Sequence, residues 1–170
     1  MKNKFSWRPP WSPPKKVKRE KDYLTYLIGP MEAVEDEGLT WRVRFEEKLE
    51  ALNIQSIIPN NYEELLKGMS SKEYKALKAT NPTKYIGIMR EIIEQDLSFV
   101  EQSDFIICKW DGDPMGGTVS EASHAVYSGV PCYLVTGIEP QDINGWFFGC
   151  FDKVFKTEKA LFSFLKKEYK

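Results

Sequence analysis

Histidine and cysteine are scarce in this sequence, which contains one histidine, His124, and three cysteines, Cys108, Cys132 and Cys150. One histidine excludes metal sites and proton relays that need several imidazoles. The cysteines are odd in number and no metal-ligand spacing joins them, which argues against a disulfide framework or a zinc site. We therefore expect free thiols in a reducing, cytoplasmic environment.

Long apolar runs and an excess of charge of one sign are also missing. No apolar run approaches the roughly 18 residues that a membrane helix needs, and no basic segment leads into an apolar one as in a signal peptide. The 24 lysines and arginines nearly balance the 25 aspartates and glutamates, so a net charge of -1 gives no general attraction to nucleic acid or membranes. With 42% hydrophobic and 29% charged residues, the 170-residue chain has the composition of a soluble globular domain with a short appendage.

The first 22 residues differ from the rest of the chain. They contain four prolines, Pro9, Pro10, Pro13 and Pro14, and close behind them a basic stretch that includes Lys15, Lys16, Lys18 and Arg19. Because proline removes backbone donors and like charges repel, we expect a basic, proline-rich arm over residues 1–22 with no helix or strand. Its aromatic residues Phe5, Trp7 and Trp11 favour docking on this subunit or a neighbour, and a tail that binds an anion is the alternative.

From residue 23 onward, short apolar runs alternate with helical patterns, which predicts one domain over residues 23–170. Strands are expected over residues 23–28, 54–58, 105–108 and 130–135, with a fifth beginning at 154, and helices over 41–52, 62–78, 85–102, 118–128 and 158–169. The strands are continuously apolar, as expected when helices cover both faces of a parallel sheet. The fold class is therefore α/β: a three-layer sandwich, flavodoxin-like or Rossmann-like, with a mostly parallel sheet of about five strands.

The loops that follow predicted strands are the expected ligand sites, because ligands bind at the carboxyl ends of strands in open α/β sheets. These loops begin after Ile28, Pro59 and Cys108. The third passes through Gly116 and Gly117 to a helix predicted to begin at Thr118, whose free N–H groups can hold phosphate or sugar oxygens. Glu121 lies about one turn into that helix. A carboxylate there can stabilise the charge that develops at C1 of a sugar when an N-glycosidic bond breaks, or it can simply complement the helix dipole.

Three segments resemble the nucleoside 2-deoxyribosyltransferase family and its relatives that hydrolyse nucleoside monophosphates. The first is Tyr26-Leu27-Ile28-Gly29-Pro30-Met31, which is similar to the family's first strand and Gly-Pro loop. The second is Asp96-Leu97, followed by Ser103-Asp104-Phe105-Ile106-Ile107. The third is Gly117-Thr118-Val119-Ser120-Glu121, followed by Gly129-Val130-Pro131. The segments occur in the family's order and span residues 23 to about 135.

The resemblance implies roles for these residues. Glu121 matches the nucleophilic glutamate, and Asp96 matches the acid that contacts the sugar or base and assists proton transfer. Met115 stands where the family's transferases have an acid, so Asp111 or Asp113 is expected to replace that acid, and we favour Asp111 because it lies nearer the strand end. Ser123 stands where relatives often have glycine. The residues expected to line the substrate site are Tyr26, Gly29, Pro30, Met31, Asp113, Met115, Gly116, Gly117 and Thr118, although Tyr26 could instead serve packing.

The expected function is cleavage or transfer at the N-glycosidic bond of a nucleoside or nucleoside 5′-monophosphate. The chemistry requires neither a metal nor an organic cofactor, and a homo-oligomer is expected because relatives complete their sites with residues of a neighbouring subunit. Two alternatives remain. Pro114, Gly116-Gly117-Thr118 and Glu121 are faintly similar to the pattern of cytokinin-activating phosphoribohydrolases. A nucleotide- or ADP-ribose-binding module without turnover is the other.

Other residues have candidate roles outside these motifs. Arg42 or Arg44 could point back to the loop after Ile28 and offer a bidentate anion site. His124 is expected to be structural or to lie at an interface, and Trp146, Phe147 and Phe148 to cap a pocket or build a subunit interface.

Overall fold

The computed structural model describes residues 14–31, 34–62, 69, 71–113 and 115–169. Its described part contains a sheet of five strands: β1 (Tyr23–Ile28), β2 (Ile54–Ile57), β3 (Phe105–Lys109), β4 (Cys132–Val135) and β5 (Lys153–Phe155). The strand order is β2-β1-β3-β4-β5 and all four pairings are parallel. This order is that of flavodoxin-like proteins, so the predicted fold class is confirmed.

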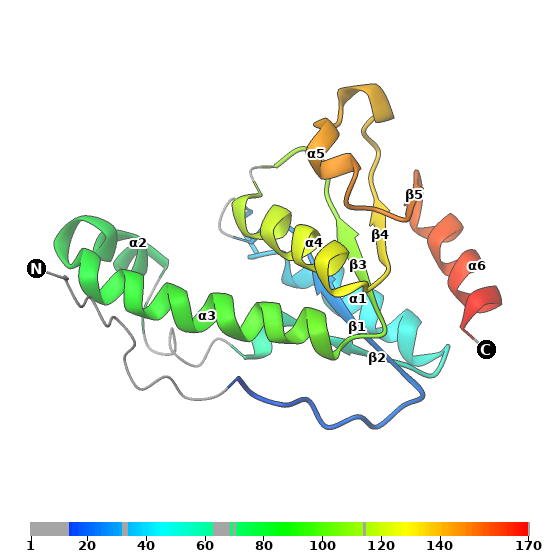
Figure 1. Ribbon diagram of the computed structural model, residues 1–170, viewed down its shortest axis with the longest axis horizontal. Helices are drawn as coiled ribbons and strands as arrows, with labels where there is room; N and C mark the ends of the chain where they lie inside the picture. The colour runs from blue at the N-terminus through cyan, green and yellow to red at the C-terminus, as the bar shows by residue number, and fades with distance from the viewer. Residues whose placement is uncertain (1–13, 32–33, 63–68, 70, 114, 170) are drawn as a thin grey trace, which may run out of the picture.

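Helices cover both faces of this sheet (Figure 1). The helices in the described part of the chain are α1 (Leu39–Glu50), α2 (Ser71–Thr80), α3 (Pro82–Gln102), α4 (Gly116–Ser128), α5 (Gly145–Phe148) and α6 (Glu158–Glu168), with single 3-10 turns at Pro59–Asn61 and Pro140–Asp142. The helix α3 begins three residues before the predicted start, because Pro82 occupies its first turn and the Asn81 side chain accepts a hydrogen bond from Lys84 N. Of the helix predicted over residues 62–78, the part from Ser71 onward lies in α2 and Tyr62 instead ends a 3-10 turn, while residues 63–68 and 70 lie outside the described residues.

The core has two halves, one on each face of the sheet. Tyr26 of β1 packs with Phe99 of α3 and Ala122 of α4 on one face. Its neighbour Leu27 packs with Phe45 of α1 and Leu161 of α6 on the other. Successive strand residues point to opposite faces, and here both faces are buried, which explains the continuously apolar strand sequences.

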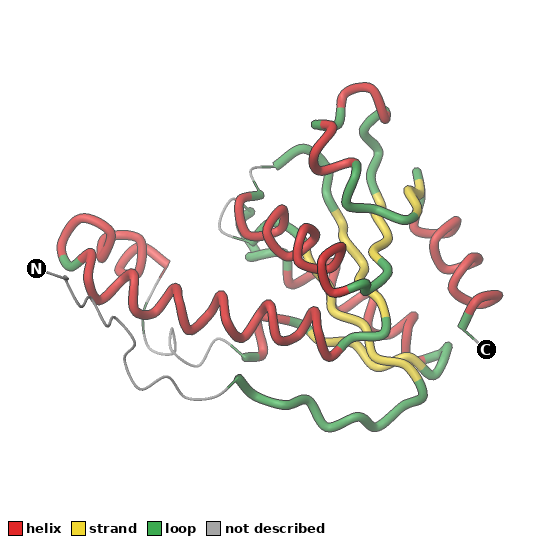
Figure 2. The backbone as a smooth tube through the Cα atoms, viewed as in Figure 1, coloured by secondary structure: helices red, strands yellow, loops and turns green. Residues whose placement is uncertain are grey.

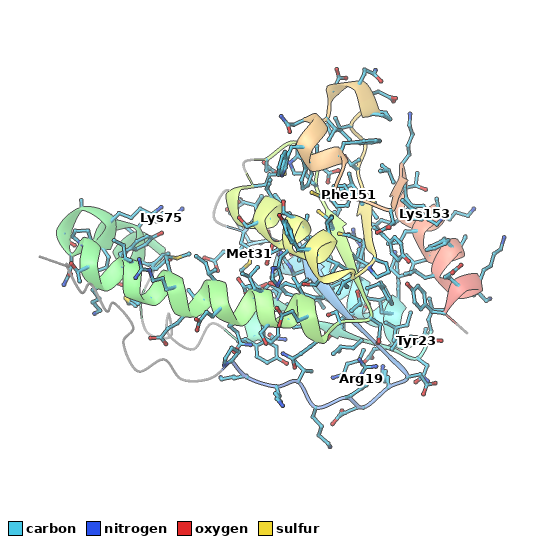
Figure 3. All side chains as sticks on the ribbon, in the orientation of Figure 1. Arg19, Tyr23, Met31, Lys75, Phe151 and Lys153 are labelled. Atoms are coloured by element: carbon cyan, nitrogen blue, oxygen red, sulfur yellow. The ribbon has the colours of Figure 1, made fainter. Side chains whose placement is uncertain are left out.

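The longest helix, α3, extends beyond the sheet, and α2 folds back along its outer half (Figure 1). The two helices meet through the rings of Tyr74 and Tyr85, whose centroids are 5.0 Å apart. Lys75 marks this projecting pair in Figure 3. No helix in the part of the chain that the structure describes is long and apolar enough to cross a membrane.

Residues 14–22 form neither helix nor strand and run along the body of the protein as a strap (Figure 2). Gln102 accepts a hydrogen bond from Val17 N, and Gln55 accepts one from Glu20 N. Arg19, labelled with Tyr23 in Figure 3, forms an ion pair with Asp104. Residues 1–13, including the aromatic residues Phe5, Trp7 and Trp11, lie outside the described residues, so the boundary predicted at residue 22 stays a prediction.

The ends of β1 and β3 lie side by side, and the chain just after β1 passes close to the end of β3. A Cβ atom added to Gly29, directly after β1, would lie 2.6 Å from the carbonyl oxygen of Lys109 at the end of β3. In this strand order β1 and β3 flank the point where the chain changes direction across the sheet, which is where such folds bind ligands. Glycine at position 29 therefore allows the two strand ends to meet at the expected ligand edge.

Substitution of Gly29 by alanine should lower the free energy of unfolding by about 1–3 kcal/mol, because the clash is with main-chain atoms that have little room to move. Urea unfolding measures this change. Gly137→Ala is the matched control, since a Cβ atom there meets nothing within 4 Å. Equal stabilities for the two variants would contradict the close approach.

Candidate functional site

Glu121 is a buried carboxylate that faces the sheet from α4. Only 9% of its surface is exposed, and its Oε1 accepts a hydrogen bond of 2.7 Å from the hydroxyl of Tyr26. Tyr26 stands in the middle of β1, is fully buried, and packs its ring against Phe99 of α3. The structure therefore brings two predicted site residues together and gives Tyr26 a definite partner.

The surroundings of this pair shift the pKa values of both groups. Burial raises the pKa of Glu121, while the hydrogen bond from Tyr26 and the positive charge of Arg42 act in the opposite direction. Burial, followed by the negative charges of Glu121 and Asp96, raises the pKa of Tyr26 well above 10. Tyr26 consequently keeps its proton near neutral pH and acts as a hydrogen-bond donor.

Asp96 enters the same neighbourhood from α3. Its side chain is partly buried, and its charge acts on the Tyr26 hydroxyl. Three elements, β1, α3 and α4, thus bring one tyrosine and two carboxylates into a common electrostatic environment. Such a group, in which burial and neighbouring negative charge both disfavour ionisation, is typical of sites that perform proton transfer or nucleophilic chemistry.

The loop after β1 lies at the carboxyl edge of the sheet. Gly29 and Pro30 are buried and Met31 is partly buried. The side chain of Arg42, from α1, donates hydrogen bonds to the carbonyl oxygens of Leu27 and Gly29. Arg42 binds main-chain carbonyls, and the half-exposed Arg44 forms an ion pair with Glu158 of α6. Because both arginines are engaged by other groups of the protein, the structure gives no support to the predicted anion site.

The loop between β3 and α4 contains the remaining predicted residues. Asp111 is exposed and forms an ion pair with Lys109, so the structure does not bring it into contact with Glu121. The carbonyl of Asp113 accepts a hydrogen bond from the Trp110 indole, 2.8 Å long. Met115 packs against the core and directly precedes α4.

The helix α4 begins at Gly116, two residues before the predicted start. Gly116 and Gly117 are exposed, and Thr118 is buried. The bond from Val119 N to Met115 O is 3.0 Å long and belongs to this first turn. The N–H groups that precede it lie at the positive end of the helix, where oxygen atoms of a ligand are favoured.

No group of three or more histidine, cysteine, aspartate or glutamate side chains that could hold a metal occurs among the described residues. The thiols of Cys108, Cys132 and Cys150 are free and buried. Burial raises the pKa of the Cys108 and Cys132 thiols well above the ordinary value, which makes them poor nucleophiles. His124 lies on the surface and its Nε2 is 3.0 Å from Glu101 Oε1.

Sequence reasoning missed two features near the site. The first is the role of Arg42, whose charge acts on Glu121. The second is the short helix α5, which places Phe147 against Trp110 with ring centroids 5.4 Å apart, while Trp146 stays 76% exposed. Asn144 supplies the one sequence signal for α5, since its side chain accepts hydrogen bonds from Trp146 N and Phe147 N.

Comparison with known proteins gives a match in structure. The protein resembles a 2-deoxyribosyltransferase from the psychrotolerant bacterium Bacillus psychrosaccharolyticus, with a TM-score of 0.61 over 81% of this chain and 89% of that chain. The sequence identity is 16%, so the likeness shows a common fold. No protein-family model and no curated protein matches the sequence. The predicted fold is thereby supported independently, while the roles of the site residues stay predictions.

Replacing Tyr26 by phenylalanine should raise the pKa of Glu121 further, because the hydrogen bond that lowers it is lost. A 13C NMR titration of the Glu121 carboxyl, assigned with Glu121→Gln, measures the shift. Tyr133→Phe is the control: its hydroxyl makes a bond of 2.8 Å to Tyr169 on the opposite face of the sheet and should leave Glu121 unchanged. An unaltered midpoint in the Tyr26 variant would refute the coupling.

Proposed function

We propose that this protein cleaves or transfers at the N-glycosidic bond of a nucleoside or nucleoside 5′-monophosphate, with Glu121 as the nucleophile. The observation that carries the proposal is the buried Glu121 carboxylate of α4, which accepts a hydrogen bond from Tyr26 of β1. The common fold with a 2-deoxyribosyltransferase, described as a suitable biocatalyst for nucleoside synthesis, is consistent with it. A carboxylate with a raised pKa is a stronger nucleophile than an exposed one.

In the first step, a carboxylate oxygen of Glu121 attacks C1 of the sugar as the bond from C1 to the base nitrogen breaks. The electron pair of that bond moves to the base, which takes up a proton, and the sugar becomes a glycosyl ester of Glu121. Tyr26 engages Oε1. We assign the attack to Oε2, to which no hydrogen bond is found within the described part of the chain.

In the second step, water or an acceptor base attacks C1 and the ester bond breaks. The electron pair returns to the Glu121 carboxylate, and the attacking group loses a proton. Asp96 is our candidate for the acid that protonates the leaving base and then accepts this proton. Its charge already acts within the same environment as Tyr26 and Glu121.

The loops at the strand ends supply the substrate contacts in this scheme. The main chain of Gly29 and Pro30 and the side chain of Met31 line the sugar from the β1 side. The first N–H groups of α4, at Gly116 and Gly117, bind sugar or phosphate oxygens. Asp111 remains our candidate for the acid that binds a sugar hydroxyl, a role in which it would exchange Lys109 for that hydroxyl.

Substitution of Glu121 by alanine should reduce base release at least about a thousandfold, the loss expected for a covalent nucleophile. Glu121→Gln, which keeps an acceptor for Tyr26, should show the same loss while remaining folded. A chromatographic screen of nucleosides and monophosphates for free base measures the rates. Glu101→Gln is the control, because Glu101 is an exposed carboxylate on α3 whose partner is His124.

The same screen, repeated with an added free base, separates transfer from hydrolysis. A new nucleoside indicates transfer to the acceptor, and free sugar or sugar phosphate indicates attack by water. Tight nucleotide binding without base release, unchanged by Glu121→Gln, would overturn the proposal in favour of a binding module. Retention of most activity in Glu121→Ala would contradict the assignment of Glu121 as the nucleophile.

A further inference from the structure

Arg42 is a fully buried arginine, the largest fully buried side chain among the described residues. Removing an isolated charge from water costs several kcal/mol, so a buried guanidinium needs good hydrogen-bond partners. Its Nε donates to Leu27 O at 3.0 Å and its Nη2 to Gly29 O at 2.9 Å. Its Nη1 donates to Glu37 O at 3.2 Å and Gly38 O at 3.1 Å.

These four carbonyls belong to the two ends of one loop. Leu27 and Gly29 lie where the chain leaves β1, and Glu37 and Gly38 lie just before α1. A single planar guanidinium therefore ties the exit of the loop to its return. Because its donors point in fixed directions, it also sets the distance between the two ends.

Two glycines make this arrangement possible. Gly38 has a φ of +70°, and a Cβ atom there would collide with Arg42 Nη1 and would lie 2.8 Å from Pro30 O. A Cβ atom on Gly29 would collide with the Lys109 carbonyl, as described above. Trp41 completes the packing, since its ring lies 4.6 Å from the Arg42 guanidinium carbon and its Cζ2 would be 3.1 Å from a Cβ atom on Gly29. The two ends of the loop therefore pack closely against the Arg42 guanidinium and its neighbour Trp41.

The charge of Arg42 also acts on the Tyr26–Glu121 pair on the opposite face of the sheet, because its guanidinium binds the carbonyl of Leu27, the residue after Tyr26. It acts to lower the pKa values of Glu121, Tyr26 and Cys108. The titratable groups coupled electrostatically to Glu121 are Tyr26 on β1, Cys108 on β3, Cys132 on β4 and, through Tyr26, Asp96 on α3. These groups are neutral or negative, and Arg42 is the positively charged group that acts on Glu121 beside them.

We propose that Arg42 is a positioning residue for the proposed reaction, which fixes both ends of the loop after β1 and places positive charge near the Tyr26–Glu121 pair. This inference rests on the proposed function for its kinetic consequences only. Its structural consequences concern the loop and the titration of Glu121, and they can be measured without any turnover.

The test compares Arg42→Gln and Arg42→Lys with Arg44→Gln. Arg44 is the matched control, an arginine two residues away on the same helix that is half exposed and paired with Glu158. Loss of the positive charge in Arg42→Gln should move the Glu121 midpoint in a 13C NMR titration to higher pH. Lysine restores the charge and should return the midpoint toward the wild-type value. Arg44→Gln should leave it unchanged.

The loop effect should separate from the charge effect, because lysine cannot span both ends of the loop. Hydrogen exchange of the Gly38 and Thr40 amides, which bond to Asp36 in this loop, should accelerate at least about tenfold in both Arg42 variants, a change of about 1.4 kcal/mol in local opening. KM should rise in both Arg42 variants while Arg44→Gln keeps the wild-type value.

Wild-type exchange of these amides in folded Arg42→Lys, or a Glu121 midpoint equal in Arg42→Gln and wild type, would overturn the inference. If Arg42→Gln fails to fold, Arg42→Lys decides through the loop amides. Absence of base release by the wild-type protein would instead overturn the proposed function, and the exchange and titration results would still judge Arg42.

Discussion

The hydrogen bond between Tyr26 and Glu121 is the interaction on which the site depends, because it holds a carboxylate where water is largely excluded. Burial raises the pKa of Glu121 above its ordinary value. A carboxyl group of this kind favours the folded state at pH values below its unfolded pKa, and that contribution is lost as the pH rises through the folded pKa. Ionised Glu121 therefore costs stability near neutral pH. A fold that retains such a group gains chemistry rather than stability from it.

The parallel sheet determines which groups can meet at this point. β1 lies between β2 and β3, so Tyr26 at its centre faces α3 and α4, while the next residue, Leu27, faces α1 and α6. Arg42 comes from α1 on the opposite face, and it reaches the site only at the edge where β1 ends. The carboxyl edge is thus where side chains from both layers of helices act together. At that edge the main chain at Gly29 lies so close to the Lys109 carbonyl of β3 that a side chain at position 29 would not fit.

Much of the fold followed from the sequence because the strands are continuously apolar, a proline marks the start of α3 at Pro82, and a glycine marks the end of α4 at Gly129. Glu121 could be identified from the sequence as a candidate site residue, since it follows Gly116 and Gly117 on a helix after a predicted strand. The hydrogen bond from Tyr26 to Glu121 could not be predicted, because a tyrosine inside an apolar strand is equally compatible with packing alone. The strand order, which the sequence pattern does not give, brings β1 beside β3 and α4. Arg42 could not be predicted as buried, since arginine in a mixed helix is usually exposed.

The two steps of the proposed reaction place opposite demands on Glu121. Attack on C1 favours a basic carboxylate, which burial supplies by raising the pKa. Breakdown of the glycosyl ester favours a carboxylate that leaves easily, which the hydrogen bond from Tyr26 and the charge of Arg42 supply by lowering the pKa. Tyr26 cannot serve as the base in either step, because burial and two neighbouring carboxylates keep its hydroxyl protonated. Proton transfer then falls to Asp96 or solvent, and the tyrosine and arginine act by balancing nucleophile against leaving group.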